Sequence, residues 1–396
     1  MNKVNYKGTL YACYLGYITQ ALIVNLPPIL FVIFRDKFGL TYTMLGSLVM
    51  VIFVTQLVTD ALAIKFVDKI GQRAAAVLAH ALAAIGMILL AFLPRVLPQP
   101  YIGLIISSIV FAIGGGLIEV LVSPIVESLP GEAKASAMSL LHSFYSWGQV
   151  LVIILSTVAL LLIGHDLWFV LPLVWALLPL FTLFKFTKVP LVPMEEESKR
   201  TPLKTLITSR IFLLALLLMV CSGASEQAMA QWASLFAEKG LGISKTLGDL
   251  LGPCLFAVMM GIVRTLYGTK GQKINIYKTL IISSALCMLS FVITAIVPIP
   301  AVSLLGFALC GLTVSLMWPG MLSLTAAGYP SGGTAMFAIM ALGGDLGCAV
   351  GPWLTGIVAD KSTLNMGLLA AIIFPAVMLI GLAVLKTLLK PQKTIH

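Results

Sequence analysis

The sequence predicts an all-α membrane protein with twelve transmembrane helices arranged as two six-helix repeats. Its composition, its number of apolar runs and the similarity between its two halves all support this fold class. Of the 396 residues, 60% are hydrophobic and 10% are charged, and the mean hydropathy is +1.06. A water-soluble domain is about 45–50% apolar and about 25% charged, so this composition indicates a chain whose surroundings are largely lipid.

Apolar runs long enough to cross a bilayer recur along the whole chain. A membrane-spanning helix needs about 20 consecutive apolar residues, and most of the loops between the runs are short. The runs cover residues 9–33, 43–66, 74–94, 101–126, 135–163, 167–187, 210–237, 247–268, 276–297, 301–328, 333–359 and 364–387. Each is therefore predicted to be one transmembrane helix.

The chain divides in the middle at a polar, charged segment that contains prolines. This segment separates the sixth run from the seventh, so we expect a six-helix bundle over residues 1–187, a cytoplasmic linker over 188–209 and a second bundle over 210–396. We expect the protein to be a monomer.

The two halves resemble each other at three places that occur in the same order. "GLIEVLVSP" at 116–124 matches "GLTVSLMWP" at 311–319, and "IGQRAA" at 70–75 matches "KGQKIN" at 270–275. "TMLG" at 43–46 also matches "KTLG", which begins at Lys245. Parallel six-helix repeats of this kind are typical of one large class of secondary transporters.

The basic residues are distributed unevenly about the predicted spans. The net charge is +10, and 19 of the 25 basic residues fall on the side of the termini. Basic residues concentrate on the cytoplasmic side of membrane proteins, so both termini are predicted to be cytoplasmic in a multi-pass protein of the cell inner membrane. The asymmetry explains the positive charge without a nucleic-acid partner.

One loop carries a recognisable motif. In "DKIGQR" at 68–73, Asp68, Lys69, Gly71 and Arg73 fit the pattern between the second and third helices of the major facilitator superfamily. The chain resembles that superfamily in this motif, in its twelve spans and in its central linker. The resemblance implies the major facilitator fold, with helices 1, 4, 7 and 10 around a central cavity.

A narrower resemblance concerns three later segments. "GASEQAMAQW" at 223–232, "SLMWPGMLSL" at 315–324 and "GGDLGCAVGPWLTGIVAD" at 343–360 are similar to segments of the fucose–galactose–glucose:proton symporter family. This implies secondary active transport of a small polar solute, a sugar, by proton-coupled alternating access. No cofactor and no metal site are expected.

Charged residues inside the spans are candidates for function because they are costly there. Four acids fall inside the predicted spans, namely Asp60, Glu119, Glu226 and Asp345, and Arg264 is the intramembrane base near them. Glu119 and Glu226 lie on predicted cavity helices with no neighbouring cation in sequence. The predicted proton-coupling residues are Glu119, Glu226, His142 and Asp345.

Amide, carboxylate and aromatic side chains suit the recognition of a sugar. The first two form hydrogen bonds with hydroxyl groups, and flat rings pack against the apolar face of the sugar. The predicted substrate-binding residues are Asn25, Glu119, Glu226, Gln227, Gln231, Trp232 and Trp318. The predicted gating residues, which would latch the cytoplasmic side through charge contacts, are Asp60, Asp68, Arg73 and Arg264.

Other functions remain open at this point. Proton-coupled efflux of a lipophilic drug is the main alternative, because one fold serves both purposes. A membrane-embedded enzyme would need a metal-spaced histidine cluster, paired aspartates on one helix or a nucleophile triad, and the chain shows none of these motifs. A structural or receptor-like protein on a transporter scaffold is a further alternative. We expect a small-molecule substrate, protons and the lipid bilayer as partners.

Overall fold

The computed structural model describes residues 5–129, 134–192, 206, 208–270, 275–329 and 333–389. Every regular element within these ranges is helical, and 12 helical segments are long and apolar enough to cross a membrane. The prediction of an all-α protein with twelve spans is therefore confirmed. Most of the linker expected at 188–209, together with the side chain of Asp68, lies outside the described residues.

The first half of the chain forms six spans, of which the sixth is divided in two. Proline opens α4, where its missing N–H has no helical partner to lose, and Thr41 caps α2 by accepting from Met44 N. The elements are α1 (Lys7–Phe38), α2 (Tyr42–Ile70), α3 (Gln72–Val96), α4 (Pro100–Ser128), α5 (Lys134–Ile163), η1 (His165–Leu167), α6 (Val170–Trp175) and α7 (Leu177–Lys188).

The second half forms the other six spans, and four of them contain breaks. The seventh span breaks after Ala230 and ends in a short π-helical turn, and a second π-helical turn interrupts the eighth span. The tenth span breaks shortly before Pro319, and the twelfth breaks after Ala370. The elements are α9 (Arg210–Ala230), α10 (Ala233–Leu235), η2 (Phe236–Gly240), α11 (Lys245–Asp249), η3 (Leu250–Cys254), α12 (Leu255–Lys270), α13 (Ile276–Ile296), α14 (Pro300–Val314), α15 (Met317–Gly328), α16 (Gly333–Lys361), α17 (Leu364–Ala370) and α18 (Ile373–Leu389).

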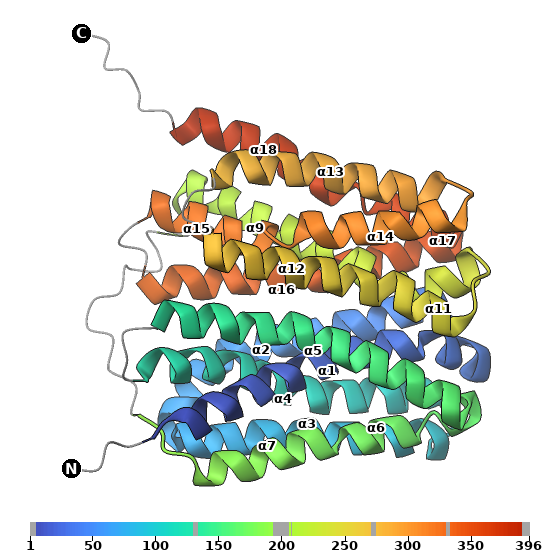
Figure 1. The fold of residues 1–396 in the computed structure, drawn as a ribbon, viewed down its shortest axis with the longest axis horizontal. Helices are drawn as coiled ribbons and strands as arrows, with labels where there is room; N and C mark the ends of the chain where they lie inside the picture. Colours follow the sequence, from blue (N-terminus) through green and yellow to red (C-terminus); the bar gives the residue numbers. More distant parts are fainter. Residues whose placement is uncertain are drawn as a thin grey trace.

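The helices lie side by side along the long axis of the molecule (Figure 1). The first half, blue to green, occupies the lower part of the view, and the second half, yellow to red, the upper part. The start of α1 and the end of α18 lie at the same end of the bundle, which we call the terminal end; the opposite one is the far end. The halves meet along two helix pairs, α2 with α16 and α5 with α12.

Small residues bring neighbouring helices close together. A Cβ atom on Gly86 of α3 would overlap the backbone of Phe111 in α4, and one on Gly347 of α16 would overlap the Val220 carbonyl of α9. Close approach at glycine is the usual means of helix association in a membrane, where apolar burial gives no advantage over lipid. These contacts hold α4 and α16 in place, and both helices carry acids of the candidate site.

Candidate functional site

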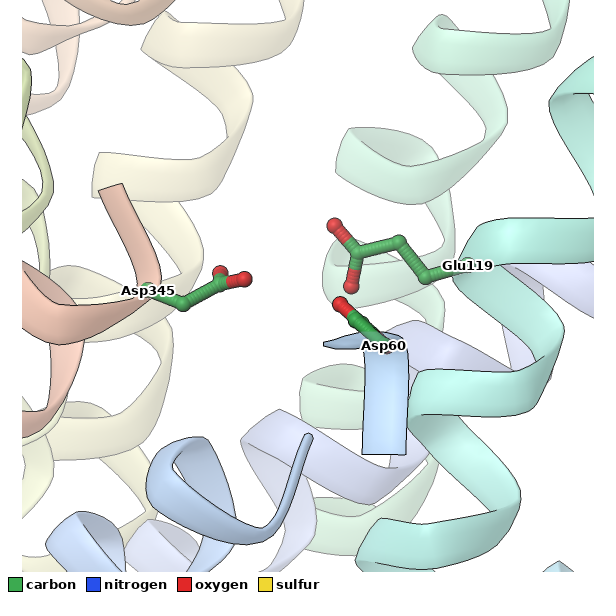
Figure 2. Close-up of side chains that lie close together, drawn as sticks. All are labelled: Asp60, Glu119 and Asp345. Atoms are coloured by element: carbon green, nitrogen blue, oxygen red, sulfur yellow. The ribbon is translucent and has the colours of Figure 1, made fainter. Parts of the chain in front are cut away.

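Three carboxylates from three helices converge between the halves (Figure 2). Asp60 lies on α2 and Glu119 on α4, both in the first half, while Asp345 points toward them from α16 in the second half. One carboxylate oxygen from each lies within 4.8 Å of the other two. We call these three residues the carboxylate cluster. The sequence singled out each acid but could not show that they meet.

Glycines on α4 make room for the cluster. A Cβ atom on Gly116 would lie 2.7 Å from Asp60 Oδ1, and one on Gly115 would lie 2.8 Å from Gln20 Oε1. Both distances are shorter than real Cβ contacts, so alanine at either position would force these side chains away. Gln20, on α1, donates from Nε2 to Glu119 Oε2 at 3.1 Å. It therefore belongs to the surroundings of the cluster, although the sequence did not single it out.

The negative charge of the cluster has no protein counter-ion among the side chains that the structure describes. None of the three acids forms an ion pair there. Asp60 Oδ1 and Asp345 Oδ2 are buried without a hydrogen-bond partner. At an effective dielectric constant of about 20, two unit charges 4 Å apart repel each other by about 4 kcal/mol. If all three acids were ionised, they would therefore repel one another across the boundary between the halves.

A second polar site lies around Glu226 on α9. Its Oε2 accepts from Arg264 Nη2 of α12 at 3.1 Å, and its Oε1 accepts from Gln227 Nε2 at 3.3 Å. The Glu226 side chain is 9% exposed and that of Arg264 is 20% exposed. Glu226, predicted as an acid without a neighbouring cation in sequence, thus has one in space. This ion pair distinguishes it from the acids of the carboxylate cluster.

The tenth span helps to position Arg264. Pro319 has no N–H to offer the carbonyl of Ser315 four residues earlier, and that carbonyl accepts from Arg264 Nε at 3.2 Å. Arg264 Nη1 also donates to Ser146 Oγ of α5 at 3.4 Å. Arg264 therefore connects the broken tenth span, the seventh span and the first half of the protein.

The amide residues of α9 continue this polar site toward α1. Gln231 donates to Gln227 Oε1 at 2.8 Å, which confirms that the two share a helix face. The same amide donates to the Val24 carbonyl at 3.4 Å, an acceptor left free by Pro28 four residues later. Asn25, one residue further along α1, is buried and donates to the Ala21 carbonyl at 2.8 Å. Gln231 thus links the halves beside Asn25.

The two predicted aromatic residues lie in packed positions. Trp232 is 0% exposed, donates to the Pro352 carbonyl at 3.0 Å and has its ring 5.9 Å from those of Phe31 and Tyr42. It presents no free face to a solute in this structure. Trp318 is partly buried, and its ring lies where a Cβ on Gly344 would be. Its ring thus packs against α16 at the residue that precedes Asp345.

His142 lies on α5, the helix of the first half that packs against α12 of the second half. Its imidazole is exposed and makes an edge contact with the Tyr17 ring, 5.3 Å between centroids. Tyr17 in turn shares a hydrogen bond of 2.8 Å with Ser123, one helical turn after Glu119. Tyr17 therefore contacts both Ser123 of α4 and the exposed His142 of α5.

Of the predicted gate residues, Arg73 forms its described contacts within its own half, while the side chain of Asp68 lies outside the described residues. Arg73 donates to the carbonyls of Phe186 and Val189 at the end of α7, at 2.7 and 2.8 Å, rather than meeting Asp60 or α16. The Phe186 carbonyl is available because Pro190 follows four residues later. Arg73 therefore holds helices of one half together, and Asp60 belongs to the carboxylate cluster.

The far end of the bundle contains several contacts between the halves that were not expected from the sequence, including an ion pair of 2.8 Å between Lys239 and Asp36. Asp360 at the end of α16 accepts from the backbone N–H groups of Tyr42 and Thr43 at 2.8 and 2.6 Å, so it caps α2. Asp249 is 0% exposed, pairs with Lys245 at 2.6 Å, and accepts from Thr157 of the first half at 3.1 Å.

Asp249 corrects the sequence-based set of four intramembrane acids, since it lies within the eighth apolar run. Lys245 precedes it by four residues, the spacing that places two side chains on one helix face, and Ser234 also donates to it. This spacing was a signal for a satisfied ion pair. Asp249 thus differs from the carboxylate cluster, whose acids make no ion pair in the described part of the chain.

Comparison with known proteins places these features in a family. Residues 13–352 match the sequence model of the Major Facilitator Superfamily. A search of curated protein sequences finds no match. Several solved structures resemble this protein over nearly the whole chain, although their sequences are only distantly similar to it.

A D-xylose–proton symporter superimposes with a TM-score of 0.77 and 16% identity, covering 96% of this chain and 97% of that one. The fucose:proton symporter of E. coli gives 0.66 and 16%, covering 96% and 99%. A nucleoside transporter gives 0.76 and 11%, covering 97% and 100%. At these identities the similarity shows the fold alone.

Proposed function

The chain belongs to the major facilitator superfamily, and we propose that it carries a small polar solute, a sugar, across the membrane by proton-coupled alternating access. The observation that carries this proposal is the carboxylate cluster. Two of its acids belong to one half and the third to the other, so its charge acts directly on the boundary that must rearrange.

Protons taken up by the cluster would remove the repulsion between the halves. Ionised, Asp345 is repelled by Asp60 and Glu119 across the boundary; neutralised, it can approach them as the structure shows. Binding and release of protons would thereby favour different arrangements of the halves, which is the requirement for coupling an ion gradient to a solute. Glu119 is central to this proposal, because Gln20 holds it in place and Ser123, one helical turn further along α4, shares a hydrogen bond with Tyr17, which contacts His142.

The polar site around Glu226 is the proposed place of solute recognition. Glu226, Gln227 and Gln231 supply acceptors and donors along one helix, and Arg264 supplies a positive charge. Asn25 lies across from them on α1. The Gln231 Oε1 atom is buried without a partner in the described structure, so a hydroxyl group of a sugar could donate to it.

The names of the similar structures agree with this proposal without deciding it. Two are proton symporters of sugars and one carries nucleosides, which are also hydroxyl-rich. The surplus of basic residues on the terminal side favours cytoplasmic termini and the inner membrane. With this orientation the contacts of Asp360 and Asp249 would close the outward-facing end.

The test is a panel of radiolabelled solutes in proteoliposomes, with and without an imposed pH gradient. Monosaccharides, nucleosides and lipophilic cations should be compared in the same preparation. We expect a sugar to accumulate above its external concentration only while the gradient is present. Gradient-driven movement of the lipophilic cations, with no sugar or nucleoside moved, would instead support drug efflux.

A further inference from the structure

An unpaired donor and an unpaired acceptor lie beside the same glycine inside the first half. Gln56 of α2 is 1% exposed, and its Nε2 atom has no hydrogen-bond partner in the part of the chain that the structure describes. Gln20 of α1 is 5% exposed, and its Oε1 atom likewise has none. A Cβ atom on Gly115 of α4 would lie 2.5 Å from the first atom and 2.8 Å from the second. Both amides therefore converge where α1, α2 and α4 meet.

The gap between the two amides has room for one small group. Because both atoms lie within these distances of one point, they are at most 5.3 Å apart, the sum of the two distances. No hydrogen bond joins them directly. One oxygen atom that forms two hydrogen bonds of about 2.8 Å spans up to about 5.6 Å. Gly115 keeps this space free, since a Cβ atom there would lie closer to both amides than Cβ atoms come in proteins.

The orientation of both amides follows from their surroundings. Gln20 Nε2 donates to Glu119 Oε2 at 3.1 Å, so its oxygen is left on the side of Gly115. Reversing the Gln56 amide would set its oxygen near that of Gln20, and two acceptors cannot share a hydrogen bond. Gln56 therefore offers a donor, and Gln20 an acceptor, to the same gap.

The gap consequently suits a group that accepts one hydrogen bond and donates another. A hydroxyl group and a water molecule both do so. A metal cation cannot accept from Gln56, and an anion cannot donate to Gln20. A buried polar atom left unpaired costs free energy, and a single hydroxyl would satisfy both amides at once.

We propose that Gln20, Gln56 and Gly115 form a binding site for one hydroxyl group, supplied either by the transported solute or by a water molecule. The site lies one helical turn from the carboxylate cluster, since Gln56 precedes Asp60 and Gly115 precedes Glu119 by four residues. A hydroxyl held there fixes the Gln20 amide that donates to Glu119. Occupation of the site is thereby linked to the position of the acid at which the proposed function places the proton. Only the solute as the source of the hydroxyl rests on that function.

The test is a structure of the purified full-length protein at a resolution that shows water molecules, first without solute and then with D-glucose as a hydroxyl-rich probe. We expect one oxygen atom within hydrogen-bond distance of both Gln20 Oε1 and Gln56 Nε2. A D-glucose hydroxyl in place of the water would assign the site to a solute, and a water that stays in both structures would assign it to water. A direct hydrogen bond between the two amides, or a gap that is empty in both structures, would overturn the proposal.

A double-mutant cycle tests the shared group in solution. Gln56→Leu removes the donor, Gln20→Leu removes the acceptor, and each alone leaves the bound hydroxyl with one partner fewer. Because one hydroxyl serves both amides, the double variant should lower the unfolding temperature by less than the sum of the two single effects. Gln56→Leu combined with Asp166→Asn, which changes an exposed acid at the far end, is the control pair and should be additive.

Additive effects of Gln20→Leu and Gln56→Leu would contradict a shared group. Neither this cycle nor the structure without solute depends on transport of a sugar. A failure of the proposed function would therefore leave the hydroxyl site standing, and a failure of the site would leave proton-driven uptake to be judged by the proteoliposome panel.

Discussion

Asp345 of α16 faces Glu119 of α4 across the boundary between the two halves, with carboxylate oxygens that lie within 4.8 Å of each other (Figure 2). No described basic side chain pairs with either acid, whereas Glu226 pairs with Arg264 and Asp249 with Lys245. The membrane core therefore holds acids of two kinds. The paired acids have a counter-ion within the protein, and the unpaired acids are those at which we propose that protons act.

The Glu226–Arg264 pair should contribute to stability as a unit. Arg264→Met leaves a buried carboxylate without its cation, a loss of about 3–5 kcal/mol for a fully buried pair and less here because Arg264 is 20% exposed. Adding Glu226→Gln removes the stranded charge, so the double variant should be more stable than Arg264→Met alone. Thermal unfolding in detergent measures this. If the double variant and Arg264→Met were equally stable, Glu226 and Arg264 would not be energetically coupled.

Asp360 should hold the far end closed. Loss of a capping side chain costs about 0.5–2 kcal/mol, which corresponds to an equilibrium shift of about 2- to 30-fold. In Asp360→Ala the far end should open more often, and a cysteine placed at Ala230, which is buried in the last turn of α9, should react faster with a water-soluble maleimide. Asp166→Asn is the matched control, since its partner Lys37 belongs to the same half. Labelling that is as fast in the control as in Asp360→Ala would rule out a specific latch.

Substitution of Gln231 should mainly affect sugar binding, whereas substitution of Trp232 should mainly affect the stability of the fold. Gln231→Ala should weaken sugar binding by about 0.5–3 kcal/mol, the range for losing one hydrogen bond or stranding a buried partner. Trp232→Phe should lower the unfolding temperature by removing the bond to the Pro352 carbonyl, and should change affinity little. Calorimetry and thermal unfolding on the same samples separate the two. A larger loss of affinity in Trp232→Phe than in Gln231→Ala would mean that the ring contacts the solute.

The exposed Lys37–Asp166 ion pair at the far end should not contribute to the pH dependence of transport near neutrality. Lys37, by hydrogen bond and charge, holds the pKa of Asp166 below its ordinary value. A lowered carboxyl pKa stabilises the fold above the unfolded pKa, and that contribution is lost as the pH falls through the folded value. Asp166→Asn should therefore leave the pH profile of transport between pH 5 and 8 as in wild type. A displaced profile would implicate the far end in coupling.

The sequence was sufficient for the fold and for the identity of many polar residues, but not for their partners. Apolar runs predict all twelve spans because the bilayer imposes their length. Whether an intramembrane acid is paired depends on residues far away in sequence: Arg264 lies 38 positions from Glu226, and Asp345 lies more than 200 from Glu119. Spacing alone could have revealed the Lys245–Asp249 pair, which lies within one helical turn.

Proline also has a consequence that is visible only in three dimensions. Pro28, Pro190 and Pro319 each free a carbonyl four residues earlier. Those carbonyls accept from Gln231, Arg73 and Arg264 respectively. The sequence indicates where a helical bond is missing, but the donor that takes the free acceptor comes from another helix.

Glu119→Gln gives the most direct test of the proposed coupling. The amide keeps the size of the side chain but cannot exchange a proton, so the variant should lose gradient-driven accumulation while retaining solute exchange. The measurement is uptake of a transported sugar into proteoliposomes under an inward pH gradient, beside exchange across the same vesicles with sugar on both sides and no gradient. We predict exchange near the wild-type rate together with no accumulation above the external concentration. Accumulation at the wild-type level in Glu119→Gln would contradict a coupling role for the cluster's central acid.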